Sequence, residues 1–254
     1  MKLYNAPAPN PRRVRIFVTE KGIDIPRVEL NLLAGENRTP EFRKLNSLGQ
    51  VPVLELDDGG IITESMAICR YLEELHPEPS LFGSNPRDRA RIEMWERRIS
   101  NEIFLRIGNV ALNTLPFFAT RRTQVAAFAQ AERQVVPEKW AWLDAELADG
   151  RPFVAGDDFS VADITGMAAS LLGEMLEIEI PTALTNVRRW DTRVRAPAEL
   201  VGLVSKNGRA GSFGSLRELP PGRRSRGRRG SRRPDFDTLR ATNRTCEGPE
   251  ARLI

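Results

Sequence analysis

Residues 49–75 read GQVPVLELDDGGIITESMAICRYLEEL and carry the clearest structural pattern of the chain. The pattern opens with the valine- and leucine-rich run 51–56, and the turn residues DDGG at 57–60 separate this run from two isoleucines. Two short apolar runs around a glycine-rich turn predict a β-hairpin. The tripeptide TES at 63–65 then opens a segment whose apolar residues recur at helical spacing, which predicts a helix with one buried face.

The chain upstream of the hairpin predicts a strand, a helix and a second strand. Residues 2–5 and 27–30 have strand character, and the run between them carries apolar residues at helical spacing. Asn10 suits the N-cap of this helix, and Pro11 suits its first position. With a short helical or irregular connection before the hairpin, the predicted order is βαβαββα, an α/β domain over residues 1–78.

Beyond this domain the pattern is helical only. Residues 76–86 contain several prolines, which punctuate a linker. The sequence SVAD at 160–163 resembles a capping box, with Asp in place of the usual Glu. We therefore expect an all-α domain over residues 87–197, with helices at 87–119, 121–148, 160–177 and 183–196.

The composition excludes several classes of protein. Of the 254 residues, 41% are hydrophobic and 28% are charged, as in ordinary soluble globular domains. No apolar run approaches the roughly 20 residues that span a bilayer, and no apolar leader opens the chain, so we expect a cytoplasmic protein without a membrane partner. His76 is the only histidine, and Cys69 and Cys246 lie far apart, so no metal site, catalytic triad or disulfide scaffold is expected.

Residues 198–254 differ from the rest of the chain. They hold 13 basic and 6 acidic residues, a net charge of +7, whereas the first 197 residues hold 25 and 28, a net charge of −3. The run GRRSRGRRGSRR has no apolar period, so we predict a disordered basic tail. Arginine-rich segments can bind nucleic acid, but few aromatic residues accompany this one. We favour a frameshifted or otherwise non-native extension, and nucleic acid is not an expected partner.

The ordered set of these motifs resembles the cytosolic glutathione transferase family. The resemblance rests on the βαβ–ββα order, on GQVPVL, on TESMAICRYL and on FVAGDDFSVADI, and it covers residues 1–196. It implies a thioredoxin-like N-terminal domain, a helical C-terminal domain and a homodimer. It also implies glutathione as co-substrate, a small electrophile or disulfide as second substrate, and a role in detoxification.

The resemblance assigns residues to the glutathione site. In the family, the residue before the VP proline presents its backbone to the cysteinyl part of glutathione, and the proline is cis; these positions are Val51 and Pro52. Glu64 and Ser65 match the acid–serine pair that holds the γ-glutamyl group. Charge supports this assignment, because a carboxylate can pair with the ligand's ammonium group while a helix N-terminus accepts its α-carboxylate.

Two further residues match positions near the glycyl carboxylate of the ligand. Gln50 lies where many relatives have Lys or Gln, and Asn37 lies in the loop where some bacterial relatives use an amide. Both residue types also occur commonly in solvated loops.

The residue that activates the thiol is open at this stage. Many relatives use a serine before the first helix, but the aligned residue is Pro9, which has no donor. Asn10 can donate through its amide, and Ala8-Pro9-Asn10 resembles the Thr-Pro-Asn motif of nu-class bacterial transferases, with Ala8 in place of the Thr. Tyr4 aligns with the catalytic tyrosine of the alpha, mu and pi classes. We expect Asn10 or Tyr4 to be the catalytic residue.

The type of reaction also has alternatives. Nu-class enzymes favour reduction of disulfides and peroxides over conjugation, and a second glutathione can resolve the mixed disulfide without a protein cysteine. Cys69, in an apolar helical pattern, is expected to be structural. The alternative to an enzyme is a non-catalytic protein with the transferase fold, either a glutathione-binding protein or a regulatory protein. A stripe of residues at helical spacing is a candidate for the electrophile pocket, although such a stripe is more often part of the core: Phe104, Asn109, Asn113 and Phe117.

Overall fold

A computed structural model describes residues 1–200, with side chains described as far as Ala196. These residues belong to one compact unit. The last helix extends to Leu200, and the remainder of the predicted disordered tail lies outside the described residues.

The first part of the chain forms a four-stranded sheet in the order β2-β1-β3-β4. β1 runs parallel to β2 and antiparallel to β3, and β3 and β4 form the predicted hairpin. The predicted thioredoxin-like order βαβαββα is therefore confirmed. Its elements are β1 (Lys2–Asn5), α1 (Pro9–Glu20), β2 (Arg27–Glu29), the 3-10 turn η1 (Glu36–Arg38), α2 (Pro40–Leu45), β3 (Val53–Glu55), β4 (Ile61–Thr63) and α3 (Ser65–Leu75).

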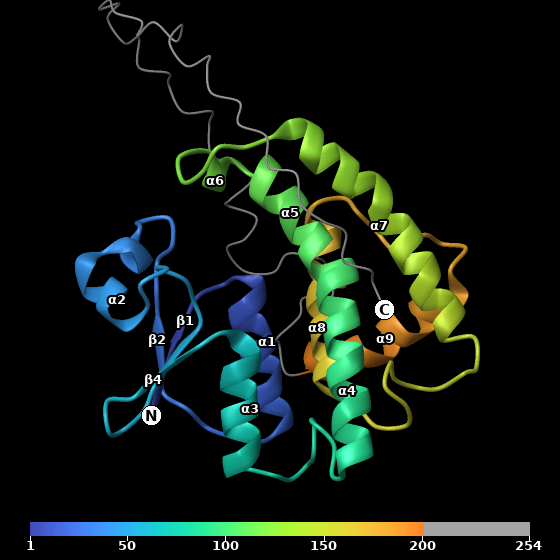
Figure 1. Cartoon of the computed structure of the whole chain (residues 1–254), viewed down its shortest axis with the longest axis horizontal. Coiled ribbons are helices and arrows are strands. Elements are labelled where there is room, and N and C mark those ends of the chain that lie inside the picture. The colour runs from blue at the N-terminus through green and yellow to red at the C-terminus, as the bar shows by residue number, and fades with distance from the viewer. Residues whose placement is uncertain (201–254) are drawn as a thin grey trace, which may run out of the picture. The chain divides into compact units, whose positions relative to one another are not determined.

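The two faces of the sheet are covered by different helices. α1 and α3 lie side by side on one face, and α2 lies on the other (Figure 1). Successive residues of a strand point to opposite faces. Accordingly Leu3 is buried with Phe17 and Ile68 in the core, while the Tyr4 ring makes an edge contact with Phe42 of α2.

The start of α1 differs from the prediction. The helix begins at Pro9, Ala8 is its N-cap with an extended backbone (φ −138°, ψ 159°), and Asn10 is its second residue. The expectation that Asn10 caps the helix and Pro11 opens it is therefore wrong. Both prolines suit a first position. The extended backbone that a following proline favours is found at Ala8, before Pro9, and not at Asn10, before Pro11.

The remaining elements form a helical layer. The predicted helix 87–119 is interrupted twice, by a π-helical turn and at Leu115, which is extended (φ −71°, ψ 131°) because Pro116 follows it. The predicted capping box is present, with the side chain of Asp163 accepting from the backbone of Ser160. The elements are α4 (Pro86–Ile99), η2 (Ser100–Phe104), α5 (Leu105–Thr114), α6 (Pro116–Ala119), α7 (Ala126–Glu146), α8 (Val161–Met175) and α9 (Thr185–Leu200).

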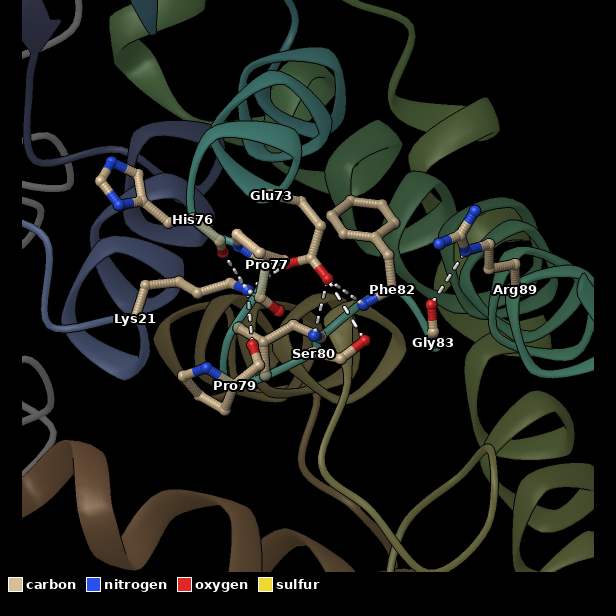
Figure 2. Close-up of polar contacts among 10 residues, drawn as sticks. Lys21, Glu73, His76, Pro77, Pro79, Ser80, Phe82, Gly83 and Arg89 are labelled. Atoms are coloured by element: carbon tan, nitrogen blue, oxygen red, sulfur yellow. Dashed lines mark hydrogen bonds and ion pairs between the residues drawn. The ribbon is translucent and has the colours of Figure 1, made fainter. Parts of the chain in front are cut away.

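One ion pair joins the end of the first domain to the linker. Lys21, after α1, pairs with Glu73 of α3, and the Lys21 side chain is fully buried (Figure 2). Its Nζ also donates to the carbonyls of His76, at 2.8 Å, and Pro79. Glu73 Oε1 accepts the backbone N–H groups of Leu81 and Phe82, at 3.0 and 3.2 Å. The linker therefore leaves α3 along a path fixed by buried polar contacts.

A second network joins α1 to the helical layer. Arg13 donates to Glu96 of α4 at 2.5 Å and to the Thr165 hydroxyl of α8 at 2.7 Å. The Arg13 guanidinium also lies 5.2 Å from the centre of the Phe104 ring. Burial lowers the pKa of Arg13, and the neighbouring Glu96 opposes that shift. Arg13 thus holds α1 against two helices of the second layer.

Candidate active site

Four chain segments meet at one end of the sheet. The register pairs Tyr4 with Val53, and Val53 with Thr63, while Asn5 pairs with Glu29. The residues that follow β1, β2 and β4 therefore lie at the same end as those that precede β3. These segments carry all of the predicted site residues except Tyr4, namely Asn10, Asn37, Gln50, Val51, Pro52, Glu64 and Ser65.

The Val51–Pro52 peptide bond is cis, which confirms the expectation from the resemblance. Pro52 is buried and Val51 is half-buried. The backbone N–H and carbonyl of Val51 have no hydrogen-bond partner within residues 1–200. Both groups are therefore available to an extended peptide ligand that lies alongside.

Glu64 and Ser65 connect β4 to α3. Glu64 has φ 67° and ψ 123°, a conformation that residues with a side chain rarely adopt, and its side chain is exposed. Ser65 is the first residue of α3 and is 5% exposed. The first-turn N–H groups of a helix have no intrahelical partner and favour anions. The turn therefore presents a carboxylate beside an anion-binding helix start, a pair suited to an amino acid's ammonium and carboxylate.

Asn37 and Gln50 differ in what they can offer a ligand. Asn37 is 7% exposed, and its Nδ2 donates to the carbonyl of Gly49 at 2.6 Å, while its Oδ1 has no partner within the described part of the chain. Gln50 has an exposed side chain, and its carbonyl accepts from Asn46 at 2.9 Å. Asn37 thus shapes the loop before Val51, whereas the amide of Gln50 is free for a ligand.

Asn10 lies in a helix turn that is poor in donors. Pro9 and Pro11 have no N–H, and the N–H of Arg12 already donates to Ala8 at 3.0 Å. The backbone N–H of Asn10 is then the free donor of this turn, and its exposed side-chain amide has no partner in the described residues. Two donors from one residue are available at the positive end of α1.

The hydroxyl of Tyr4 is already engaged. It donates to Glu55 Oε2 at 2.8 Å. Partial burial and this carboxylate raise the pKa of Tyr4, and the nearby Lys2 opposes the shift. The contacts of Tyr4 are with the α2 side of the sheet, at Phe42 and Glu55, so its phenol and the Asn10 amide belong to different environments.

The stripe considered for an electrophile pocket is engaged within the protein. Asn109 donates to Glu132 of α7 at 3.0 Å, and Asn113 Oδ1 accepts the N–H of Val125 at 3.0 Å. Their side chains therefore join α5 to α7, and the assignment of the stripe to an electrophile pocket stays a prediction. Helical spacing showed that they share a face but not that α7 covers it. Phe104 lies against Arg13, as described, and the Phe117 ring lies against Arg121.

Three remaining expectations concern the cysteine in α3, metal ligands and membrane-spanning helices. Cys69 is fully buried in α3, and burial raises the pKa of its thiol, so it is a structural residue. Among residues 1–200, no group of three or more His, Cys, Asp or Glu side chains could hold a metal ion. No helix in that range is both long enough and apolar enough to cross a membrane.

Sequence patterns missed two contacts between the layers. One is the Arg13–Glu96–Thr165 network, for which a charged residue within an apolar helix face was the only signal. The other joins Arg121 to the carbonyl of Leu32 at 2.5 Å, across 89 positions of sequence, and no local pattern reports it.

Comparison with known proteins agrees with this geometry. A family model described as the glutathione S-transferase N-terminal domain matches residues 1–74, and the corresponding C-terminal model matches residues 109–197. Glutathione S-transferase 2 of Saccharomyces cerevisiae is 34% identical over 200 residues, which cover 77% of this chain and 85% of that protein.

Solved structures show the same arrangement. The crystal structure of Gtt2 from Saccharomyces cerevisiae superposes with a TM-score of 0.75 and 32% identity, covering 80% of this chain and 100% of that one. A glutathione S-transferase of class Gtt2 from Vibrio parahaemolyticus has a TM-score of 0.68 and 38% identity, covering 77% of this chain and 93% of that one. The similarity therefore extends over both layers of the fold.

Proposed function

Since the chain belongs to the glutathione S-transferase family, we propose that it binds glutathione at the end of the sheet where β3 begins. There it activates the glutathione thiol as a nucleophile. The observation that carries the proposal is the turn at Glu64–Ser65, which lies at the same end of the sheet as the cis Val51–Pro52 bond. A left-handed backbone at a residue with a side chain is costly and concentrates at functional sites.

Each part of the ligand has a partner in this proposal. The γ-glutamyl ammonium pairs with Glu64, and its carboxylate binds the Ser65 hydroxyl and the free N–H groups of α3. The cysteinyl backbone pairs with the free N–H and carbonyl of Val51 beside Pro52. The glycyl carboxylate receives the exposed amide of Gln50, while Asn37 holds the loop through Gly49.

Asn10 is the thiol activator in this proposal. Its backbone N–H and side-chain amide have no partner in the part of the chain that the structure describes, and they lie at the positive end of α1, where a thiolate is stabilised. Tyr4 is the weaker candidate, because a hydroxyl that donates to Glu55 has no proton left for the sulfur.

The thiolate then has two uses. In conjugation its sulfur forms a bond to an electrophilic carbon, and the leaving group departs with its electron pair. In reduction it attacks a disulfide, and a second glutathione releases the reduced product as the first becomes glutathione disulfide. We propose that the protein works as a homodimer and uses the second reaction as well as the first.

The test is a titration of the thiolate absorbance of glutathione bound to the full-length protein. We expect a thiol pKa below that of free glutathione, and we expect Asn10→Ala to move it back towards the free value. The matched control is Asn101→Ala, since Asn101 is also exposed; it should change nothing. Bound glutathione with an unshifted pKa would support a binding protein without turnover instead. No bound glutathione at all would refute the proposal.

A further inference from the structure

The corner between α6 and α7 (residues 120–125) is held by hydrogen bonds to α5 and to Leu115. Gln124 donates to the carbonyls of Leu112 and Leu115, at 3.1 and 2.9 Å. The N–H of Val125 donates to Asn113 at 3.0 Å. These part-buried polar contacts hold the end of the loop that leads into α7. The position of the corner is therefore set by α5 and α7.

From this corner, Arg121 reaches the other layer. Its guanidinium lies 3.7 Å from the centre of the Phe117 ring and donates to the carbonyl of Leu32 at 2.5 Å. Leu32 belongs to the loop between β2 and α2, which also carries Asn37. A stacked guanidinium has few accessible rotamers, so its N–H groups are pre-oriented towards the loop.

The contact leads by a short route to the glutathione residues. Leu32 O also accepts the N–H of Gly35, at 3.2 Å, which closes the turn before η1. Asn37, in η1, then donates to Gly49, the residue before Gln50. Gly49 has φ 62°, and a Cβ at this position would lie 2.7 Å from the carbonyl oxygen of Asn37. The two loops are therefore packed backbone against backbone.

The charges around Arg121 distinguish this contact from an ion pair. Burial and the neighbouring Arg38 lower the pKa of Arg121. Neither arginine has a carboxylate partner among the described residues. Arg121 is thus held by a carbonyl and a ring face, with a like charge nearby, and this contact can release more readily than a buried salt bridge.

We propose that Arg121 is a positioning residue for glutathione binding: it ties the loop between β2 and α2 to the helical layer, and through Asn37 and Gly49 it fixes Gln50 and Val51. This inference rests on the proposed glutathione site. It makes glutathione affinity depend on a residue of the helical domain that does not touch the ligand.

The experiment compares Arg121→Ala with Arg122→Ala in the full chain. Arg122 is the adjacent exposed arginine, and its side chain has no partner in the described range, so it controls for net charge. We expect Arg121→Ala to raise the KM for glutathione about fivefold, the scale of one modest hydrogen bond. The kcat at saturating glutathione and the Tm should stay close to wild type. Arg122→Ala should leave all three unchanged.

A double-variant cycle with Asn37→Ala tests the route. If Arg121 acts through Asn37, adding Arg121→Ala to Asn37→Ala produces little further rise in KM. Additive effects, an unchanged KM for Arg121→Ala, or an equal rise for Arg122→Ala would each overturn the inference. Wild-type protein that binds no glutathione would instead refute the proposed function, so the two failures are distinguishable.

Discussion

The two layers of the molecule meet in two chemically different ways. At α1 the contact is the buried ion pair of Arg13 with Glu96, and where the linker leaves α3 the buried pair of Lys21 with Glu73 holds the N–H groups of Leu81 and Phe82. At the other contact, Arg121 binds the neutral carbonyl of Leu32 and, among residues 1–200, no acid. The first kind resists any change that would separate its charges in a dry environment, whereas the second can open at the cost of about one hydrogen bond.

The difference indicates where the protein can adjust. The Lys21–Glu73 pair lies at the linker, and the Arg13–Glu96 pair lies in α1, three residues after Asn10. The Arg121 contact lies at the loop that leads to Gln50 and Val51. The contact that can open at the lowest cost is therefore the one at the loop leading to the proposed ligand residues.

The largest effect should follow from breaking the rigid junction. Glu73→Ala leaves Lys21 buried without its acid and removes the acceptor of two N–H groups, at Leu81 and Phe82. We expect the free energy of unfolding to fall by about 3–5 kcal/mol, measured by urea denaturation. Glu74→Ala, at the exposed neighbour, should cost less than about 0.5 kcal/mol.

A second variant separates charge from packing at the same place. In Lys21→Met/Glu73→Gln no buried charge remains unpaired, so much of the lost stability should return. If the double variant is as unstable as Glu73→Ala, packing rather than charge holds the junction, and the contrast between the two contacts loses its basis.

At the start of α8, the buried Asp163 makes the stability of the helical layer depend on pH. Asp163 is fully buried and accepts four hydrogen bonds, from Val154 N–H, from the N–H and hydroxyl of Ser160 and from Trp190 Nε1; burial raises its pKa to about 6. Since the unfolded pKa is about 3.9, the folded state binds the proton more tightly. The stability from Asp163 is therefore fully present below about pH 4 and is lost as the pH rises through 6.

Comparison with Asp163→Asn isolates this contribution, because all other carboxyl groups titrate alike in both proteins. At pH 7 the variant should be less stable by about 1–3 kcal/mol, since an amide nitrogen meets donors where the carboxylate accepted. The stability gap should widen as the pH falls from 7 to 4. A gap that narrows over this range would mean that the four donated hydrogen bonds, not burial, control the proton.

Local signals predicted most of the fold, whereas the candidate site residues came from the resemblance to a family. The hairpin, α3 and the capping box at Ser160 follow from spacing and turn chemistry, which act within a few residues. The start of α1 was misplaced because Pro9 and Pro11 both suit a first helical turn, and the extended backbone of Ala8 decides between them. The break at Leu115 could have been predicted from Pro116, since a residue before proline resists the helical conformation.

The remaining features depend on contacts between distant segments. Helical spacing placed Asn109 and Asn113 on one face, but only the packing of α7 shows that this face is an interior contact. The backbone of Glu64 and the Arg121–Leu32 contact have no local signature either. Composition and period report which residues are buried, and they do not report which neighbour buries them.

At the proposed ligand site, replacing Glu64 by glycine should raise stability and weaken glutathione binding. Its φ of 67° is unfavourable for any residue with a Cβ, so Glu64→Gly should raise the free energy of unfolding by about 1 kcal/mol. The same change removes the carboxylate proposed to hold the ligand's ammonium and should weaken glutathione binding in calorimetry. Glu64→Gln is the matched control: it should weaken binding without the gain in stability. Stability unchanged in Glu64→Gly would show that the turn is not strained.

The smallest expected effect concerns Tyr4, and it decides between the two candidate activators. Tyr4→Phe removes the hydrogen bond to Glu55 and keeps the ring against Phe42. We expect the free energy of unfolding to fall by less than about 1 kcal/mol, since the bond is partly exposed. The kcat and the pKa of the bound thiol should stay as in wild type, because the hydroxyl serves the sheet and not the sulfur. A large loss of kcat with the thiol pKa restored to the free value would transfer the role from Asn10 to Tyr4. The Glu55 carboxylate would then have to release the phenol whenever glutathione binds.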